Sequence, residues 1–128
     1  MTIDLWMLVA SVGLSFVLTM LAATPSLLRN PLWALGNRDE VLGVVPKLQG
    51  RLQRADANLR ENLPMFAALV LVVQVAGQAD ATSALGAQLF FWGRVAHAAV
   101  YVVGVPYVRT LIWAASVTGM VIIASVLF

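Results

Sequence analysis

The chain has 128 residues, of which 61% are hydrophobic and only 11% are charged. A soluble domain carries about 25% charged residues, so this composition indicates an integral membrane protein. The net charge of +2 does not indicate a nucleic-acid partner, the absence of cysteine excludes disulfides and thiolate ligands, and one histidine is too few for a histidine-rich metal site. No metal is expected.

Four apolar segments follow one another, over about 5–28, 58–78, 84–104 and 107–128. Each has close to the ~20 residues that an α-helix needs to cross a bilayer. No basic region or cleavage site marks the first segment as a signal peptide, so it is expected to be a retained helix. The last two links are very short, which places consecutive helices antiparallel. The sequence therefore predicts one all-α domain over residues 1–128, an integral membrane four-helix up-down bundle.

The polar stretch between the first two segments predicts a loop over about 29–57, bent by its prolines and glycines. Residues 29–61 hold ten of the fourteen charged residues, whereas the next link carries Asp80 and no cation. Lys and Arg concentrate in cytoplasmic loops of membrane proteins. We therefore expect a multi-pass integral membrane protein with this loop in the cytoplasm and both termini outside. A bacterial inner membrane is the expected location.

Polar residues form two stripes near the cytoplasmic half of the predicted bundle. One stripe enters the second helix, and the other lies on the third, where Arg94 stands near the centre of an apolar run. The stripes consist of Arg51, Arg54, Asn58 and Glu61, and of Arg94, His97 and Tyr101. Residues three and four apart share one face of an α-helix. A charge among lipid chains is costly unless it faces protein, a partner or water, so the stripes are expected to line an internal polar site.

Glu61 and Arg94 have a physical reason to pair, because each is costly alone at that depth. Such a pair would equally fix helix register without binding anything. His97 alone fits a satisfied core histidine better than a catalytic base, and Tyr101 alone fits the aromatic belt at a membrane interface. Taken together, the excess of cations and the carboxylate favour a pocket for a zwitterionic ligand that bears carboxylates and an amine.

Arg109 and Thr110 begin the fourth predicted helix, on the same side of the membrane as Glu61. A guanidinium there would add its charge to the helix dipole and stabilise a thiolate, the reactive form of a thiol. Because the chain has no cysteine, the thiol would come with a ligand, and Thr110 would donate a hydrogen bond to its sulfur. The alternative is that Arg109 is an interfacial arginine that only follows the charge bias of the loops.

Two stretches resemble signatures of the MAPEG family (membrane-associated proteins in eicosanoid and glutathione metabolism). Residues 51–66, RLQRADANLRENLPMF, resemble the second helix of that family. Residues 93–101, GRVAHAAVY, followed by Pro106 and Arg109, resemble its third helix. The motifs occur in the expected order, and the four-helix plan covers the whole chain. The nearest branch is that of the microsomal glutathione transferases and prostaglandin E synthases.

The resemblance implies a homotrimer that binds glutathione between subunits near the cytoplasmic side. The implied glutathione-binding residues are Arg29, Arg54, Asn58, Glu61, Arg94, His97 and Tyr101. Among them, Glu61 would hold the free amine of the tripeptide, and Arg29 would contact one of its carboxylates. The implied catalytic residues are Arg109, which stabilises the thiolate, and Thr110, which stands where some members carry a serine.

The sequence departs from the family pattern at three places. Ala57 stands where some relatives have a further glutathione-binding arginine, and Trp113 stands where the prostaglandin synthases have a tyrosine. Arg109 also lies one residue closer to Tyr101 than in those synthases. These differences leave the expectation of glutathione binding in place and argue against prostaglandin isomerisation.

The expected function is a membrane glutathione transferase that activates glutathione as a thiolate and conjugates it to lipophilic electrophiles, with a role in detoxification. Peroxidase activity toward lipid hydroperoxides is an expected second activity. The alternatives are a glutathione-dependent lipid isomerase or synthase and a non-catalytic membrane scaffold of the same fold. The expected partners are glutathione, a lipophilic electrophile or lipid, membrane lipid and further copies of the chain, with no nucleic acid.

Overall fold

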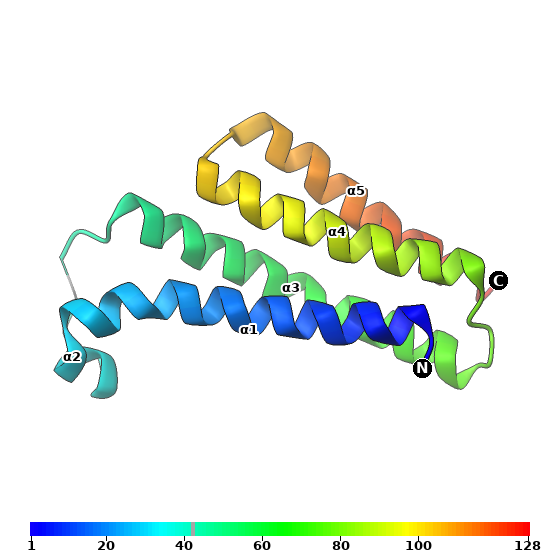
Figure 1. The fold of residues 1–128 in the computed structure, drawn as a ribbon, viewed down its shortest axis with the longest axis horizontal. Coiled ribbons are helices and arrows are strands. Elements are labelled where there is room, and N and C mark those ends of the chain that lie inside the picture. Colours follow the sequence, from blue (N-terminus) through cyan, green and yellow to red (C-terminus); the bar gives the residue numbers. More distant parts are fainter. Residues whose placement is uncertain (42) are drawn as a thin grey trace.

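The computed structural model describes residues 1–41 and 43–128, and within them it contains five α-helices and no strand (Figure 1). The helices are α1 (Ile3–Arg29), α2 (Pro31–Leu35), α3 (Lys47–Val75), α4 (Ala81–Val103) and α5 (Pro106–Ser125). The all-helical class predicted from the sequence is confirmed. The short helix α2, which lies inside the expected loop, was not predicted.

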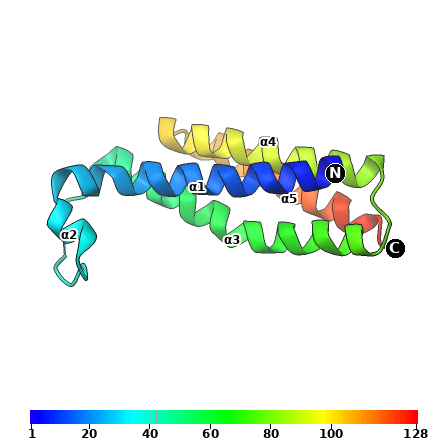
Figure 2. The same ribbon diagram turned by 60° about the horizontal axis from the view of Figure 1, so that its bottom comes forward.

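The four long helices run in alternating directions along the molecule (Figure 1). Both termini and the α3–α4 link lie at one end, and α2 lies at the other. Helix α4 packs against α1, α3 and α5, whereas no Cα atoms of α1 and α5 lie within 8 Å of each other among the described residues. The α4–α5 hairpin therefore joins the α1–α3 pair mainly through α4, with a smaller contact between α3 and α5 (Figure 2). The four long helices are thus packed openly, and the exact four-helix bundle expected from the sequence stays a prediction.

Two helices begin earlier than the apolar patterns predicted. Helix α3 begins at Lys47 and not near residue 58, because the polar stripe that leads into the apolar segment is itself helical. Helix α4 begins at Ala81, because Asp80 and Ser83 form a capping box. The Ser83 N–H donates to Asp80 Oδ1 at 2.8 Å, and the Asp80 N–H donates to Ser83 Oγ at 3.0 Å. Helix α2 and the first turns of α3 thus occupy parts of the predicted loop.

Helix α1 buries small and polar residues and exposes large apolar ones, which reverses the pattern of a helix in a soluble protein. Its buried residues are Asp4, Ser11, Ser15, Leu18 and Ala22. Its exposed residues include Trp6, Val9, Phe16 and Met20. Small residues allow helices to approach closely within lipid, where no hydrophobic driving force favours burying a large apolar side chain against protein. The distribution therefore supports a membrane setting.

Two helices, α1 and α5, are long and apolar enough to cross a membrane. Their most apolar 18-residue windows have mean hydropathies of 2.1 and 1.6. Helices α3 and α4 do not meet the same measure, because polar residues such as Asn58, Arg94 and His97 interrupt their apolar runs. The composition of the helices thus supports two of the four predicted spans, and the other two stay predictions.

The main hydrophobic core lies between α3, α4 and α5 in the half of the molecule nearer the termini. Its buried residues are Phe66, Val70, Val73, Ala87, Phe90, Met120 and Ile123. The rings of Phe66 and Phe90 stack with their centres 3.9 Å apart. Because the apolar contacts are concentrated in this half, the polar stripes of α3 and α4 meet in the other half, toward α2.

Helices α4 and α5 approach each other closely at Gly86 and Gly119. A Cβ atom added to either glycine would lie 2.6 Å from the carbonyl oxygen of the other. About two turns farther along α4, a Cβ atom on Gly93 would lie 2.9 Å from Cβ of Ser116. The obstacles at the first pair are backbone atoms, which cannot rotate away. Small residues at these positions therefore allow α4 and α5 to form a tight hairpin.

At the end that holds both termini, Asp4 joins three helices. Its Oδ2 accepts a hydrogen bond from Ser83 Oγ at 2.8 Å and another from Gln74 Nε2 at 3.1 Å. Gln74 also donates to Thr2 Oγ1 at 2.7 Å. Asp4 is only 1% exposed, so the two hydrogen bonds to Oδ2 replace part of the water that a buried carboxylate loses, whereas Oδ1 has no hydrogen-bond partner among the described residues. The cluster holds α1 against α3 and α4 at the end opposite the polar stripes.

Candidate functional site

A small hollow opens between α3, α4 and α5 where the polar stripes meet. Its volume is about 190 Å³, and it is lined by Asn58, His97, Tyr101, Arg109, Thr110 and Trp113. Asn58 comes from α3, His97 and Tyr101 come from consecutive turns of α4, and the other three come from the first two turns of α5. Five of the nine site residues predicted from the sequence therefore surround one space, and Trp113 joins them.

Tyr101 stands at the centre of the cationic and aromatic contacts in this region. The guanidinium carbon of Arg109 lies 4.6 Å from the centre of the Tyr101 ring, and that of Arg54 lies 6.0 Å from it. The His97 ring meets the same ring edge-on at 5.5 Å between centres. Arg54 also lines a second hollow, of about 160 Å³, which shares Tyr101 and Arg109 with the first. Arg54 thus joins the site through Tyr101.

Arg94 does not line either of these hollows, because only 1% of the residue is exposed. Its Nη1 donates a hydrogen bond to Asn58 Oδ1 at 2.7 Å. Its guanidinium carbon lies 5.2 Å from the centre of the Phe90 ring. Its Nε and Nη2 are buried without a hydrogen-bond partner in the part of the chain that the structure describes. Arg94 therefore contacts the hollow through Asn58.

The expected ion pair between Glu61 and Arg94 does not form within this chain. Glu61 is exposed, and the one ion pair among the described residues joins Arg60 and Asp56 at 2.9 Å. The reason is angular, because residues three apart on an α-helix point about 60° away from each other. Asn58 faces α4, so Glu61 is turned toward the exposed side of α3.

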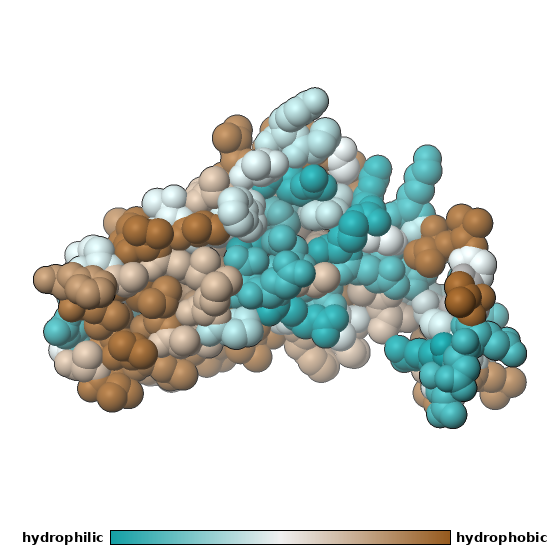
Figure 3. Space-filling view, turned by 180° about the vertical axis from the view of Figure 1, so that it is seen from behind, coloured by the Kyte–Doolittle hydropathy of each residue, from teal (hydrophilic) through white to brown (hydrophobic). Residues whose placement is uncertain are grey.

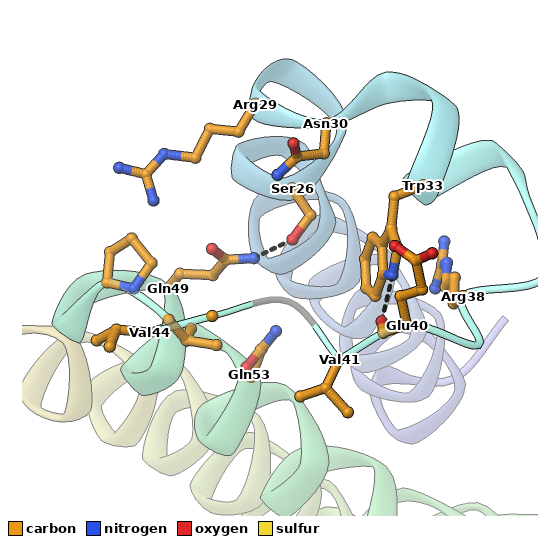
Figure 4. Close-up of a pocket in the computed structure, with 13 residues that line it drawn as sticks. Ser26, Arg29, Asn30, Trp33, Arg38, Glu40, Val41, Val44, Gln49 and Gln53 are labelled. Atoms are coloured by element: carbon orange, nitrogen blue, oxygen red, sulfur yellow. Dashed lines mark hydrogen bonds between the residues drawn. The ribbon is translucent and has the colours of Figure 1, made fainter.

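Arg29 lies apart from the other predicted ligand residues, at the end of α1. It lines a separate hollow of about 370 Å³ near α2 and the start of α3, together with Trp33 and Gln49 (Figure 4). In that hollow Gln49 donates to Ser26, and Trp33 Nε1 donates to the Glu40 carbonyl at 2.6 Å. Arg29 lines neither of the hollows that Arg109 lines, so the two arginines are not brought together within one subunit.

The hollow beside Tyr101 has the chemistry of an anion site. Each side chain that lines it carries a hydrogen-bond donor, and no carboxylate lines it among residues 1–41 and 43–128. Arg109 contributes a full positive charge. On one face of the molecule, hydrophilic residues gather in the middle and toward the α2 end, and hydrophobic residues cover the rest (Figure 3). Such a donor-rich hollow suits a carboxylate or a thiolate.

The sequence model of the MAPEG family matches residues 5–128, which is nearly the whole chain. The chain belongs to the MAPEG family. No curated protein and no solved structure matches it. MAPEG proteins are membrane proteins that generally use glutathione as substrate or cofactor. The family includes glutathione transferases and related synthases, and some members are not catalytic. The family predicted from the two motifs is thus confirmed, and its branch stays a prediction.

In this MAPEG chain, Arg51 and Gly104 shape the site, although neither was among the implied glutathione-binding or catalytic residues and Arg51 was expected only as a member of a polar stripe. Arg51 Nη1 donates to the last carbonyls of α4, those of Val102 at 3.1 Å and Val103 at 3.3 Å. Gly104 ends α4 with a φ of 91°, and a Cβ atom there would lie 2.6 Å from Cζ of Arg51. A glycine with Pro106 two residues later is typical of a helix end, so the sequence did carry the signal.

Proposed function

We propose that this MAPEG protein is a membrane glutathione transferase. Its residues would bind glutathione, hold the thiol as a thiolate and direct the sulfur toward an electrophilic carbon of a lipophilic compound. A carbon–sulfur bond would form as the leaving group departs with its electron pair. The observation that carries the proposal is the meeting of Arg109, Tyr101 and Asn58 at one donor-rich hollow, in a family that generally uses glutathione.

Arg109 is the proposed thiolate-stabilising residue. It is half-buried in the first turn of α5, where its charge and the partial positive charge of the helix N-terminus act on the same region. The Tyr101 ring, 4.6 Å away, fixes the direction of its guanidinium. Thr110 and Tyr101 line the same hollow and have hydroxyl groups that can donate to sulfur. Together they would favour the thiolate over the thiol.

An apolar second substrate would approach along α5. Trp113 lines the hollow and is 39% exposed, and Leu111 and Tyr107 on the same helix are more exposed still. In a membrane these side chains would face lipid, so a compound dissolved in the bilayer would meet an apolar path that leads to Arg109. Lipid hydroperoxides would use the same path, which supports peroxidase activity as a second activity.

A homotrimer would complete the site. The two hollows that share Tyr101, of about 190 and 160 Å³, are each smaller than the roughly 300–1,000 Å³ typical of ligand pockets. Glu61 and Arg29 are exposed and lie outside both hollows. A neighbouring subunit placed against the exposed side of α3 would enclose the ligand and let Glu61 or a neighbour's Arg29 reach it.

The test is to add glutathione to the purified protein and to follow thiolate absorbance against pH together with conjugation to an aryl halide. We expect a thiolate band at a pH where free glutathione is mostly thiol, whose reference pKa is about 8.5. In Arg109→Ala, kcat should fall by about 10²–10³, because a charge that stabilises the reacting anion is lost. The affinity for glutathione should change much less.

The matched control is Arg60→Ala, which removes an exposed cation from α3 outside the hollow and should leave kcat unchanged. Wild-type kcat and an unshifted thiol titration in Arg109→Ala would make Arg109 an interfacial anchor. Absence of both the thiolate band and the conjugate in the wild type would favour the scaffold. Glutathione binding with a rearranged lipid product would favour the isomerase or synthase.

A further inference from the structure

The hydrogen bond between Arg94 and Asn58 determines which end of the Asn58 amide a ligand meets. An arginine side chain has donors only, so the Asn58 atom 2.7 Å from Arg94 Nη1 must be the carbonyl oxygen. The reverse orientation would set two donors against each other. Because Asn58 also lines the hollow beside Tyr101, the part of its amide that remains for a ligand is the Nδ2 donor.

The charge on Arg94 also strengthens that donor. Arg94 is 1% exposed and forms no ion pair within the described residues, so its positive charge is compensated by no carboxylate there. A charged donor polarises the amide that accepts from it, and polarised hydrogen bonds strengthen their neighbours in a low-dielectric interior. The Asn58 N–H groups should therefore bind an anion more tightly than those of an isolated amide.

We propose that Arg94 is a positioning residue that acts through Asn58 and does not touch the ligand. It orients and polarises the Asn58 amide, so that the hollow offers an anionic part of glutathione donors alone. This proposal rests on the proposed function and deepens it. It differs from the sequence-based expectation, in which Arg94 was itself a glutathione-binding residue.

The sharpest test is Asn58→Asp, which keeps the shape and the oxygen that accepts from Arg94 but replaces the Nδ2 donor with a second acceptor. The new carboxylate would pair with the buried guanidinium, so thermal stability in detergent should rise. It would also repel an anion, so glutathione affinity should fall at least about 10-fold, as expected for a lost hydrogen bond to a charged group. A merely structural pair would show no such opposition between the two readouts.

The matched control is Gln78→Glu, the same amide-to-acid change at an exposed residue just past the far end of α3, which lines neither the hollow beside Tyr101 nor the hollow of Arg29. It should leave glutathione affinity within about 2-fold, because solvent and salt screen its exposed charge from a ligand bound near Tyr101. If Asn58→Asp binds glutathione as tightly as the wild type, the proposal is overturned while the proposed function stands. If the wild type itself does not bind glutathione, the proposed function fails.

A double-mutant cycle tests the coupling independently of that variant. Glutathione affinity is measured for Arg94→Met, Asn58→Ala and the double variant, each with its melting temperature. Since Arg94 acts through Asn58, each single change should weaken binding by about 10-fold, and the double variant should be no weaker than Asn58→Ala. Losses that multiply to about 100-fold would show that Arg94 contacts the ligand separately and would overturn the proposal.

Discussion

Asn58 and Glu61 stand three residues apart on α3, yet only Asn58 reaches Arg94. A buried guanidinium is thus held by a neutral amide, and the carboxylate next to it stays exposed. Because Asn58 and not Glu61 faces Arg94, no negative charge from α3 lies in the hollow beside Tyr101. At the scale of the residue, the donor-rich lining of the hollow depends as much on where Glu61 points as on the presence of Arg109.

Because Glu61 is exposed, we expect Glu61→Gln to weaken glutathione binding but to leave the stability of the fold nearly unchanged. Glutathione affinity should fall about 10-fold, because the proposed contact to the ligand amine loses its charge. Stability should change by no more than about 0.5 kcal/mol, because no ion pair within the chain is lost. Calorimetric titration with glutathione and thermal unfolding in detergent measure the two effects. Unchanged affinity would remove Glu61 from the site, and a large loss of stability would reveal an ion pair made only in the assembled protein.

Much of the candidate site could be predicted because helical spacing is visible in a sequence. Arg54 and Asn58 are four residues apart, as are His97 and Tyr101, so each pair lies on one face of its helix whatever the rest of the fold is. The partner of Arg94 could not be predicted, because Asn58 and Glu61 differ by only about 60° around α3 and the packing of α4 decides between them. The place of Arg29 likewise depends on which helices touch.

At the scale of the element, the apolar runs predicted the long helices well and their ends less well. Helix α2 has five residues, which is too short for a periodic pattern to show. The spacing of Arg51, Arg54 and Asn58 already indicated helix before residue 58, but the start at Lys47 was not visible because the first turns of α3 are polar on most sides. Helix α5 packs against α4 and α3, and it approaches α4 most closely at Gly86 and Gly119. The sequence alone does not show which glycine of α4 faces which glycine of α5.

That close approach predicts an inverted response to a glycine substitution. Alanine in place of a helical glycine normally stabilises a helix by up to about 1 kcal/mol. In Gly86→Ala the added methyl group would press on the Gly119 carbonyl oxygen, so we expect destabilisation of about 1–3 kcal/mol. Thermal or denaturant unfolding in detergent measures the change. Gly13→Ala on α1 is the control, because a Cβ atom there meets nothing within 4 Å and should be neutral or stabilising.

At the scale of the whole molecule, both termini lie at one end and α2 lies at the other (Figure 1). Residues 29–61, which include α2 and the first half of α3, carry six of the eight Lys and Arg residues, so the predicted topology puts that end in the cytoplasm and the termini outside. Hydrophobic residues cover the end of the molecule that holds both termini, which fits a position within the lipid bilayer (Figure 3). The uneven distribution of cations along the chain is visible in the sequence. The trimer is not, because it depends on contact surfaces between subunits that a single chain does not define.

The predicted orientation can be measured with reporters fused after Phe128. A reporter that is active only outside the cytoplasm, such as alkaline phosphatase, should be active, and one that fluoresces only in the cytoplasm should be dark. The same reporters inserted in the exposed segment near Arg38 should give the opposite pattern, which is the internal control. Cytoplasmic signals at both positions would contradict the prediction, because the three spans expected between Arg38 and Phe128 put the two positions on opposite sides of the membrane.

The Asp4 cluster has a practical consequence for work on this protein. Ser83, which it binds, and Tyr101, at the site, are separated along α4 by about 27 Å at ~1.5 Å per residue. Energies of changes so far apart, with no shared partner, add. Stabilising substitutions at the end that holds both termini can therefore offset the losses that substitutions around Arg109 or Asn58 cause. Weakened variants of the candidate site could then still be purified and compared on an equal footing.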